Sequence, residues 1–390
     1  MIIDYRLPEN RRQIFWDAYF FHLKYRSMAG FVYAYIPFLQ EKLNWSIEDS
    51  LWFCFLNGLT QSPTMSYYIM SAFPCVNSLD EQKFKEWYFE PVGNGKVRWQ
   101  VLIIDMDRRH YRNSIADSIA HYRKCLKGET QEEFFTSHYC GDKFQNFDAI
   151  WKRVYEGKTG EKFYTFGRLS SFSYLEYLFI AGMNIDCSSF FAEDHGGSKS
   201  HRSGMAKLLG RDDLDEHSSN PSYVKGQTLH TSPVMDMLGE EMEALYAEAL
   251  ERFKGTEVER WVSRFTLETQ LCNFKSWFRK SRRYPNVYAD MAYDRLVKTE
   301  ASPYFKNVDF SIFWEARKKY LPTVLRPESY PANRGVTSYK QNLYRLTGRQ
   351  HTLGLISDRY EGVPAETATK KGRRPKPSPR KARKKTLSYS

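Results

Sequence analysis

The chain has 390 residues, of which 42% are hydrophobic and 16% aromatic, enough apolar material for a large buried core. This composition excludes a chain that is disordered over most of its length. The formal net charge is +12, but the stretch 370–390 holds ten of the 58 basic residues and no acid, which leaves 48 basic against 46 acidic residues elsewhere. The excess charge therefore belongs to the C-terminal tail.

The tail and the remaining composition limit the partners. Residues 361–390 are rich in Pro, Lys and Arg, so we expect a disordered arm that binds a polyanion such as DNA, with Lys381 and Arg383 among its contacts. The longest apolar run, FVYAYIPFL (31–39), is too short to cross a bilayer, so no membrane partner is expected. The six cysteines form no C-x-x-C pair, which indicates reduced thiols.

The first half of the chain is predicted to be helical. Apolar residues recur at spacings of three and four over 11–26, 46–59 and 114–126. Ser46 and Asp49 resemble a capping box at the start of the second of these helices.

One stretch of the first half predicts a strand instead. VRWQVLII (97–104) is rich in apolar and β-branched residues and follows the turn sequence GNGK. The sequence as a whole shows no internal repeat of fixed period.

The second half predicts three more helices. The first covers 166–183, with one buried stripe, and the second covers 201–210 and ends at Gly210. The third covers 233–254, with Ser232 as the N-cap and Pro233 at the first helical position. The stripe of the first is Phe172, Leu175, Phe179 and Gly182, and that of the third is Val234, Leu238, Met242, Leu245, Ala249 and Phe253.

These elements predict a mainly α protein. We expect one large helical domain over 1–360, with a candidate sub-boundary near 128–145, followed by the disordered basic tail 361–390. The fold class is therefore helical, with very little sheet.

The loop EDHGGSKSHRSG (193–204) gathers more chemistry than any other stretch. A glycine-bearing loop that runs into a helix start presents free backbone N–H groups and the positive end of the helix dipole, which bind phosphate or carboxylate. Glu193 and Asp194 could hold Mg²⁺ beside that anion or accept a proton from an amine. The alternative is that Ser198 or Ser200 caps the helix and the charges are solvated. The predicted anion-binding residues are Gly197, Ser198, Lys199, Ser200, His201 and Arg202.

A second candidate is ETQLCNFKSWFRKSRRY (268–284). Glu268, Cys272 and Lys275 are spaced to lie on one helical face, and a basic run follows them. This run is the most plausible DNA-phosphate contact outside the tail. The thiol is either a nucleophile or a buried structural group.

Several segments together resemble one known family, the bacteriophage amino acid:DNA transferases, also named α-glutamyl/putrescinyl thymine pyrophosphorylases. The loop at 193–204 is the most specific of them. The matching segments are WFCFLNGLTQSP (52–63), DMDRRHY (105–111), FGRLSSFSYLEYL (166–178), EDHGGSKSHRSGMAKLLGRDDLD (193–215), ETQLCNFKS (268–276) and RRYPNVYADMAYDR (282–295).

This resemblance implies a step in the hypermodification of thymine in phage DNA. A separate kinase pyrophosphorylates a 5-hydroxymethyluracil base, and the transferase then replaces the pyrophosphate with an amino acid or a polyamine. The resemblance also implies a fold similar to the helix-hairpin-helix DNA glycosylases, which suits base flipping. A phage protein of this kind acts in the host cytoplasm.

The resemblance and the residue chemistry together suggest site roles. The leaving pyrophosphate needs fixed positive charge and N–H donors, and the attacking amine needs a base. The carboxylate of an amino acid would pair with Arg168 or Arg282. The candidate catalytic residues are Glu193, Asp194, His201, Glu268 and Cys272; those for pyrophosphate are Gly197, Ser198, Lys199, Ser200 and Arg202; and those for DNA are Lys275, Arg279, Arg283, Lys381 and Arg383.

Two other functions stay open on the sequence. A glycosylase-like enzyme could use the same helical scaffold to cut the N-glycosidic bond. A non-catalytic DNA-binding partner of the hydroxymethyluracil DNA kinase, or a packaging protein, would rely on the basic tail. Apart from Mg²⁺, no cofactor is expected, and the sequence does not settle the metal.

Overall fold

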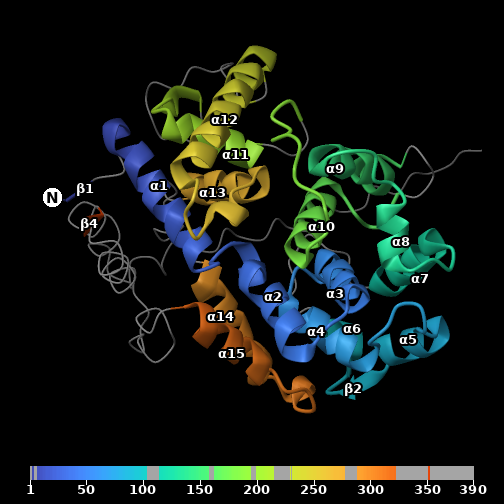
Figure 1. Ribbon diagram of the computed structural model, residues 1–390. Helices are drawn as coiled ribbons and strands as arrows, with labels where there is room; N and C mark the ends of the chain where they lie inside the picture. The colour runs from blue at the N-terminus through green and yellow to red at the C-terminus, as the bar shows by residue number, and fades with distance from the viewer. Residues whose placement is uncertain are drawn as a thin grey trace, which may run out of the picture.

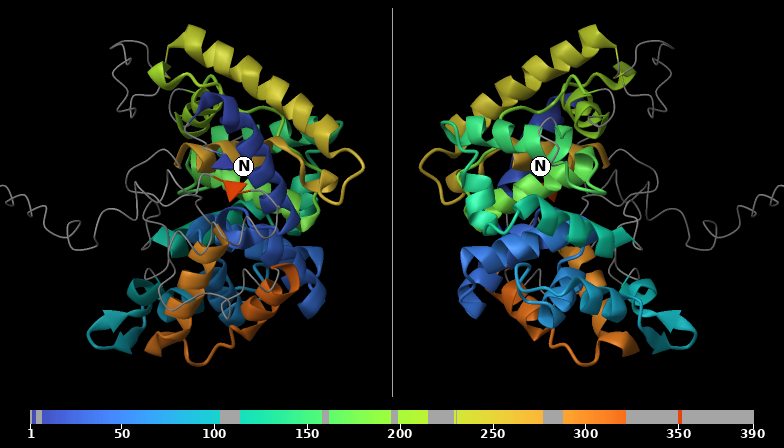
Figure 2. Two further views of the ribbon diagram at one scale, coloured as in Figure 1. Left: turned by 90° about the vertical axis from the view of Figure 1, so that its left-hand side faces the viewer. Right: turned by 90° about the vertical axis from the view of Figure 1, so that its right-hand side faces the viewer.

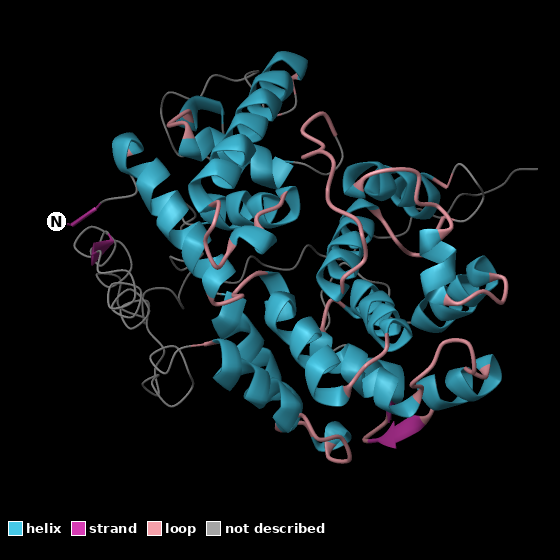
Figure 3. Cartoon of the chain, viewed as in Figure 1, coloured by secondary structure: helices cyan, strands magenta, loops and turns pink. Residues whose placement is uncertain are grey.

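The structure, a computed structural model, describes residues 2–3, 7–102, 114–157, 162–194, 199–214, 229, 231–276, 288–321 and 350–351. Helices dominate this part of the chain, and its strands are short (Figure 3). The predicted mainly α fold is confirmed. The tail at 361–390 lies outside the described residues, and the sub-boundary near 128–145 stays a prediction.

The elements are labelled in chain order in Figure 1. The α-helices are α1 (Pro8–Lys24), α2 (Val32–Leu43), α3 (Ile47–Thr60), α4 (Pro63–Ala72), α5 (Glu81–Tyr88), α6 (Arg98–Leu102), α7 (Ile115–Leu126), α8 (Gln131–Thr136), α9 (Lys143–Trp151), α10 (Arg168–Ala181), α11 (Lys199–Leu208), α12 (Ser232–Phe253), α13 (Arg264–Ser276), α14 (Tyr288–Glu300) and α15 (Ser311–Tyr320). The other helical turns are η1 (Ala29–Phe31), η3 (Lys152–Glu156), η4 (Asp212–Leu214), η5 (Glu259–Trp261) and η6 (Pro303–Phe305). The strands β1 (Ile2–Ile3) and β4 (Gln350–His351) pair in parallel, and β2 (Pro91–Gly93) pairs with β3 (Lys96–Val97) in an antiparallel hairpin.

The three helices predicted in the first half are confirmed as α1, α3 and α7. The capping box of α3 is also present. The Asp49 amide donates to the Ser46 hydroxyl at 3.2 Å, and the Asp49 carboxylate accepts from the Ser46 amide at 2.9 Å. Local capping chemistry therefore fixes where this helix begins.

The strand predicted over 97–104 is wrong. Pairing stops at Val97, and Arg98–Leu102 form the short helix α6. The side chain of Gln100 accepts a hydrogen bond from the Val97 amide at 3.0 Å, so a local contact takes the donor that a longer strand would use. Arg98 is held by the Trp87 carbonyl at 3.0 Å and the Tyr68 hydroxyl at 2.7 Å, which turns the chain away from the hairpin. Residues 103 and 104 lie outside the described part.

The predicted helices of the second half appear as α10, α11 and α12, with corrections at their ends. Gly182 is exposed and ends α10 with φ 104°, so it does not belong to the buried stripe. Helix α12 begins at Ser232, with Thr231 rather than Ser232 at the N-cap, and Val234 is half-buried. Gly210 closes α11 as predicted, with φ 75°. The remaining stripe residues are buried, except for half-buried Phe179.

Aromatic rings hold α10 against α13. The Phe265 ring of α13 lies 5.1 Å from Phe172 and 5.7 Å from Phe179, both on α10, measured between ring centroids. Phe147 of α9 packs on the other side of Phe265 at 5.6 Å. The contacts of Phe265 with Phe172 and Phe147 are edge-to-face, a geometry that favours defined ring positions, so α10 and α13 keep a fixed relation.

Helix α11 lies unusually close to α13, with α1 and α12 beside the pair (Figures 1 and 2). A side-chain carbon at Gly204 would lie 2.1 Å from the Leu271 carbonyl oxygen and 2.6 Å from its carbon. At this point the two backbones touch, because glycine has no side chain to separate them. The crossing brings the polar faces of the two helices together.

We expect Gly204→Ala to destabilise the protein by about 1–3 kcal/mol or more, because the new methyl group would meet rigid backbone. Gly167→Ala is the matched control: its Cβ has nothing within 4 Å, and a change of less than about 0.5 kcal/mol is expected. Urea unfolding monitored by circular dichroism measures both values. Equal stability of the two variants would contradict the close crossing.

Candidate active site

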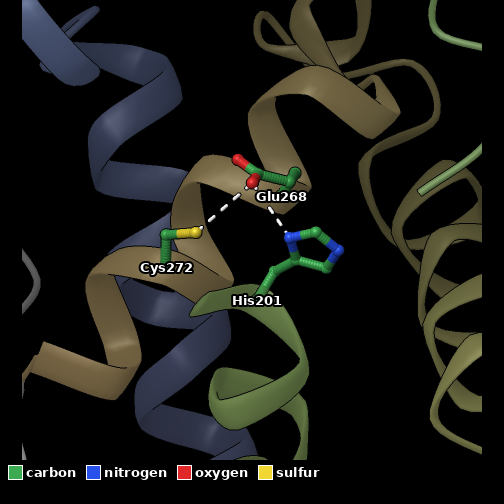
Figure 4. A group of neighbouring side chains, drawn as sticks. All are labelled: His201, Glu268 and Cys272. Carbon is green, nitrogen blue, oxygen red and sulfur yellow. Dashed lines mark hydrogen bonds and ion pairs between the residues drawn. The ribbon is translucent and has the colours of Figure 1, made fainter. Parts of the chain in front are cut away.

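The centre of the site is a contact between His201 of α11 and Glu268 of α13. The imidazole Nδ1 lies 3.0 Å from the Glu268 Oε1 atom (Figure 4). His201 is fully buried, and the Glu268 side chain is 12% exposed. The two residues are far apart in sequence, and the crossing of α11 and α13 brings them together.

The third member of the cluster is Cys272, one turn after Glu268 on α13. Its thiol donates to the same Oε1 atom, with Sγ 3.4 Å away. Burial raises the pKa of this thiol well above its usual range, and the charge of Glu268 raises it further. The thiol is therefore protonated at neutral pH and hydrogen-bonds the carboxylate.

The Glu268 carboxylate stays ionised despite its burial. Burial alone would raise its pKa, but the hydrogen bond from His201 and the charge of Arg168 hold the pKa below its usual range. An ionised carboxylate accepts hydrogen bonds only, so the His201 Nδ1 atom must carry a proton toward it. In a neutral ring with this orientation, Nε2 is the nitrogen that can accept a proton.

Figure 4 shows Nε2 on the side of the ring turned away from Glu268. It is buried and has no hydrogen-bond partner among the described residues. A buried acceptor without a partner is rare and costs free energy, so it calls for an explanation.

The first residues of the loop at 193–204 contact Arg168 of α10 and Arg202 of α11. The Asp194 carboxylate pairs with the Arg168 Nε atom at 2.5 Å, and the Arg168 guanidinium lies over the rings of Phe172 and Phe191 at 5.6 and 5.5 Å. Asp194 is 30% exposed and Arg168 is 11% exposed at the side chain. An anion and a cation thus lie side by side at the edge of the site. Glu193, next to them, is exposed.

Arg202 of α11 fixes the backbone of this loop by hydrogen bonds. It is fully buried, and its Nη1 atom donates to the carbonyl oxygens of Ala192 at 2.6 Å and Asp194 at 2.8 Å. The structure therefore gives Arg202 a positioning role in the loop. Its predicted contact with pyrophosphate stays a prediction.

Cations gather where α11 begins. The Lys275 ammonium of α13 hydrogen-bonds the Ser200 hydroxyl, and Lys275 is buried to 8% exposure. Lys199 opens α11 and is half-buried. The start of a helix also offers unpaired N–H groups and a positive dipole. Two of the predicted anion-binding residues, Lys199 and Ser200, therefore lie beside Lys275, which was predicted to contact DNA. Their roles stay predictions.

Other predicted residues lie outside the described part of the chain. They are Gly197, Ser198, Arg279, Arg282, Arg283, Lys381 and Arg383; the family-like segment 105–111 also lies outside. Their roles stay predictions.

Sequence reasoning missed Glu176. This residue lies on α10, two turns after Arg168, and accepts a hydrogen bond from the Tyr33 hydroxyl at 2.9 Å. Burial, together with the charge of Glu268, raises the pKa of Glu176 to about 8. The one feature of the sequence that could have indicated Glu176 is that it is an isolated acid inside an apolar helix. The predicted apolar stripe of that helix does not include it.

The cluster is also a possible metal site by composition. One ligand atom each from His201, Glu268 and Cys272 lies within 4.8 Å of the other two. Nitrogen, oxygen and sulfur ligands together suit zinc, whereas Mg²⁺ prefers oxygen ligands alone. The expected Mg²⁺ at Glu193 and Asp194 stays a prediction, with the Asp194 carboxylate already paired to Arg168.

Comparison with known proteins identifies the class of enzyme. Residues 31–284 match the family model of the amino acid:DNA transferases, so the chain belongs to this family. A serinyltransferase of Salmonella phage ViI is 28% identical over 386 residues, covering 94% of this chain and 88% of that protein. No solved structure matches, so the expected likeness to DNA glycosylases stays a prediction. Among the described residues, no helix is long and apolar enough to span a membrane.

The buried Glu176 carboxyl gives a pH prediction. Its pKa rises from 4.5 in a free chain to about 8 in the folded protein. Between these values the folded protein binds the proton more tightly, so this group's contribution to stability is lost as the pH rises. Glu176→Gln should match the wild type near pH 5 and become relatively more stable up to pH 8, by at most about 1.4 kcal/mol per pH unit.

The measurement is the unfolding free energy in urea at three or more pH values across this window. Tyr33→Phe is the control, because it removes the hydroxyl and leaves the buried carboxyl in place. A Glu176→Gln variant with the same pH dependence as the wild type would show that the carboxyl ionises normally.

Proposed function

We propose that the chain replaces the pyrophosphate of a pyrophosphorylated 5-hydroxymethyluracil in DNA with an α-amino acid. The observation that carries this proposal is the meeting of two features at the start of α11. A group of cations lies there, beside a buried imidazole–carboxylate pair. Family membership supplies the reaction class, transfer of an amino acid to DNA, and this arrangement suits its leaving group.

The cations are proposed to stabilise the negative charge of the leaving pyrophosphate. Pyrophosphate departs with several negative charges, and fixed positive groups in a partly dry site stabilise that charge far better than water does. Lys199 and Lys275 supply ammonium groups, and the α11 start supplies backbone donors. A Mg²⁺ ion that arrives with the pyrophosphate would add to this stabilisation.

The nucleophile is proposed to be an α-amino acid rather than a polyamine. The neighbouring charges of Arg168 and Asp194 are complementary to the carboxylate and ammonium of a free amino acid. The relative from Salmonella phage ViI is named a serinyltransferase, which favours serine or a similarly small amino acid. A polyamine has no carboxylate and would leave Arg168 without a substrate contact.

The remaining partners follow from this reaction. A DNA kinase acting on hydroxymethyluracil must supply the pyrophosphorylated base, and the target base must be flipped out of the helix to reach a buried cluster. The DNA backbone would contact the basic run that follows Lys275. The glycosylase-like and non-catalytic readings have less support, because the family model is that of a transferase.

The test uses DNA that carries pyrophosphorylated 5-hydroxymethyluracil. The protein is incubated with this DNA and a mixture of amino acids and polyamines, and the digested nucleosides are analysed by mass spectrometry. We expect a nucleoside heavier by one amino acid residue and an equal amount of released pyrophosphate. Unchanged bases with intact DNA binding would contradict the proposal, and abasic sites would indicate a glycosylase.

Lys275→Gln should lower kcat by about 10²–10³-fold, because one donor to the leaving group is lost in the transition state. Lys254→Gln, an exposed position after α12, is the charge-matched control and should behave as the wild type. Single-turnover release of pyrophosphate measures both. Equal rates for the two variants would remove Lys275 from the leaving-group site.

A further inference from the structure

We propose that His201 is the general base of the transfer, accepting a proton at its Nε2 atom, and that Glu268 is the positioning residue that orients it. This inference rests on the proposed function, since it names the group that activates the amino acid. It goes beyond that function because the leaving-group cations alone do not explain how the nucleophile loses its proton.

The reaction needs such a base for any nucleophile that an amino acid offers. The lone pair of the attacking nitrogen or oxygen forms a bond to the exocyclic methylene carbon. The bond from this carbon to the pyrophosphate oxygen breaks, and its electron pair leaves with the pyrophosphate. The attacking atom still carries an extra proton, which must pass to an acceptor nearby.

The Nε2 atom of His201 meets the requirements of that acceptor. Nδ1 donates to the ionised Glu268 at 3.0 Å, so Nε2 is the ring nitrogen that is left to accept a proton. It is buried and has no hydrogen-bond partner among the described residues, which leaves it available to a substrate group. When Nε2 takes the proton, the resulting imidazolium lies against a carboxylate that stabilises it.

The carboxylates in and near the loop are less suited to this task. Asp194 is paired with Arg168 at 2.5 Å, and Glu193 is exposed to solvent. Glu176 is buried against the Tyr33 hydroxyl. Glu268 itself already accepts hydrogen bonds from His201 and Cys272 on one oxygen.

Two rival uses of the same cluster make different predictions. In the first, Cys272 would add to the pyrimidine ring as a covalent nucleophile. In the second, His201, Glu268 and Cys272 would jointly hold a zinc ion. Both rivals require the sulfur atom, whereas a base oriented by Glu268 does not. Variants of Cys272 therefore separate the three possibilities.

The first experiment measures kinetics and metal content of the full chain. His201→Gln and Glu268→Gln should each lower kcat by about 10²–10⁴-fold with little change in DNA affinity. Cys272→Ala should stay within about tenfold of the wild type. Inactive Cys272→Ala, or stoichiometric zinc in the purified wild type that this substitution removes, would overturn the proposal. So would a His201→Gln variant that keeps its kcat.

The second experiment asks whether His201 acts chemically. In His201→Ala, removal of the buried ring leaves space for free imidazole. Added imidazole should restore kcat in a saturable manner, while neither His201→Ala nor the rescue changes the circular dichroism spectrum. Folded His201→Ala that imidazole does not rescue would indicate a structural role instead.

The third experiment tests the role of Glu268 without any turnover. In ¹⁵N-histidine-labelled protein, the nitrogen signals assigned by His201→Gln should show a ring protonated at Nδ1. Glu268→Leu should shift the proton toward Nε2, because no acceptor then faces Nδ1. An unchanged tautomer would refute the positioning role. Wild-type protein that fails to modify the DNA would overturn the proposed function, whereas this measurement would still decide how the pair is arranged.

Discussion

The site depends on one backbone contact, the approach of Gly204 in α11 to the Leu271 carbonyl of α13. His201 lies three residues before Gly204, and Glu268 lies three residues before Leu271. Each functional side chain is therefore about one helical turn from the point where the two backbones touch. A larger residue at the crossing would move both side chains apart. Arg11 of α1 fixes the far end of α11 by donating to the Lys207 carbonyl at 2.7 Å.

A second constraint connects the loop to these helices. Arg202 is buried with its Nη1 atom on two loop carbonyls, and the same loop presents Asp194 to Arg168 at the start of α10. Buried carbonyls that lose a charged donor cost about 1–3 kcal/mol each, so the loop is strongly held in this arrangement. Charged groups of α10, α11 and α13 and of the loop thus interact as one network. A substitution in any one of these elements should alter the positions or the pKa values of charged groups in the others.

The sequence predicted the parts of this site better than their assembly. Helical spacing placed Glu268 and Cys272 on one face, where the structure has them in contact, and the loop chemistry named His201, which the structure brings to Glu268. Their meeting across 67 positions depends on the close helix crossing, which local periodicity does not encode. The strand at 97–104 failed for a related reason, because the Gln100 side chain and the buried position of Val101 outweigh the β propensity of the segment. Glu176 was missed because an acid within an apolar stripe shows its role only through its partners.

The two buried carboxyls of the site differ in charge state because their surroundings differ. Glu268 faces an imidazole and a guanidinium, which hold its pKa low, whereas Glu176 faces the Tyr33 hydroxyl and is raised to about 8. Two titratable groups whose pKa values are pushed apart in this way are typical of acid–base sites. Keeping Glu176 neutral spares the buried cluster a second negative charge. That charge would lie near the ionised Glu268 and oppose it. The free energy that this acid removes from folding at neutral pH is therefore the cost of keeping it uncharged beside Glu268.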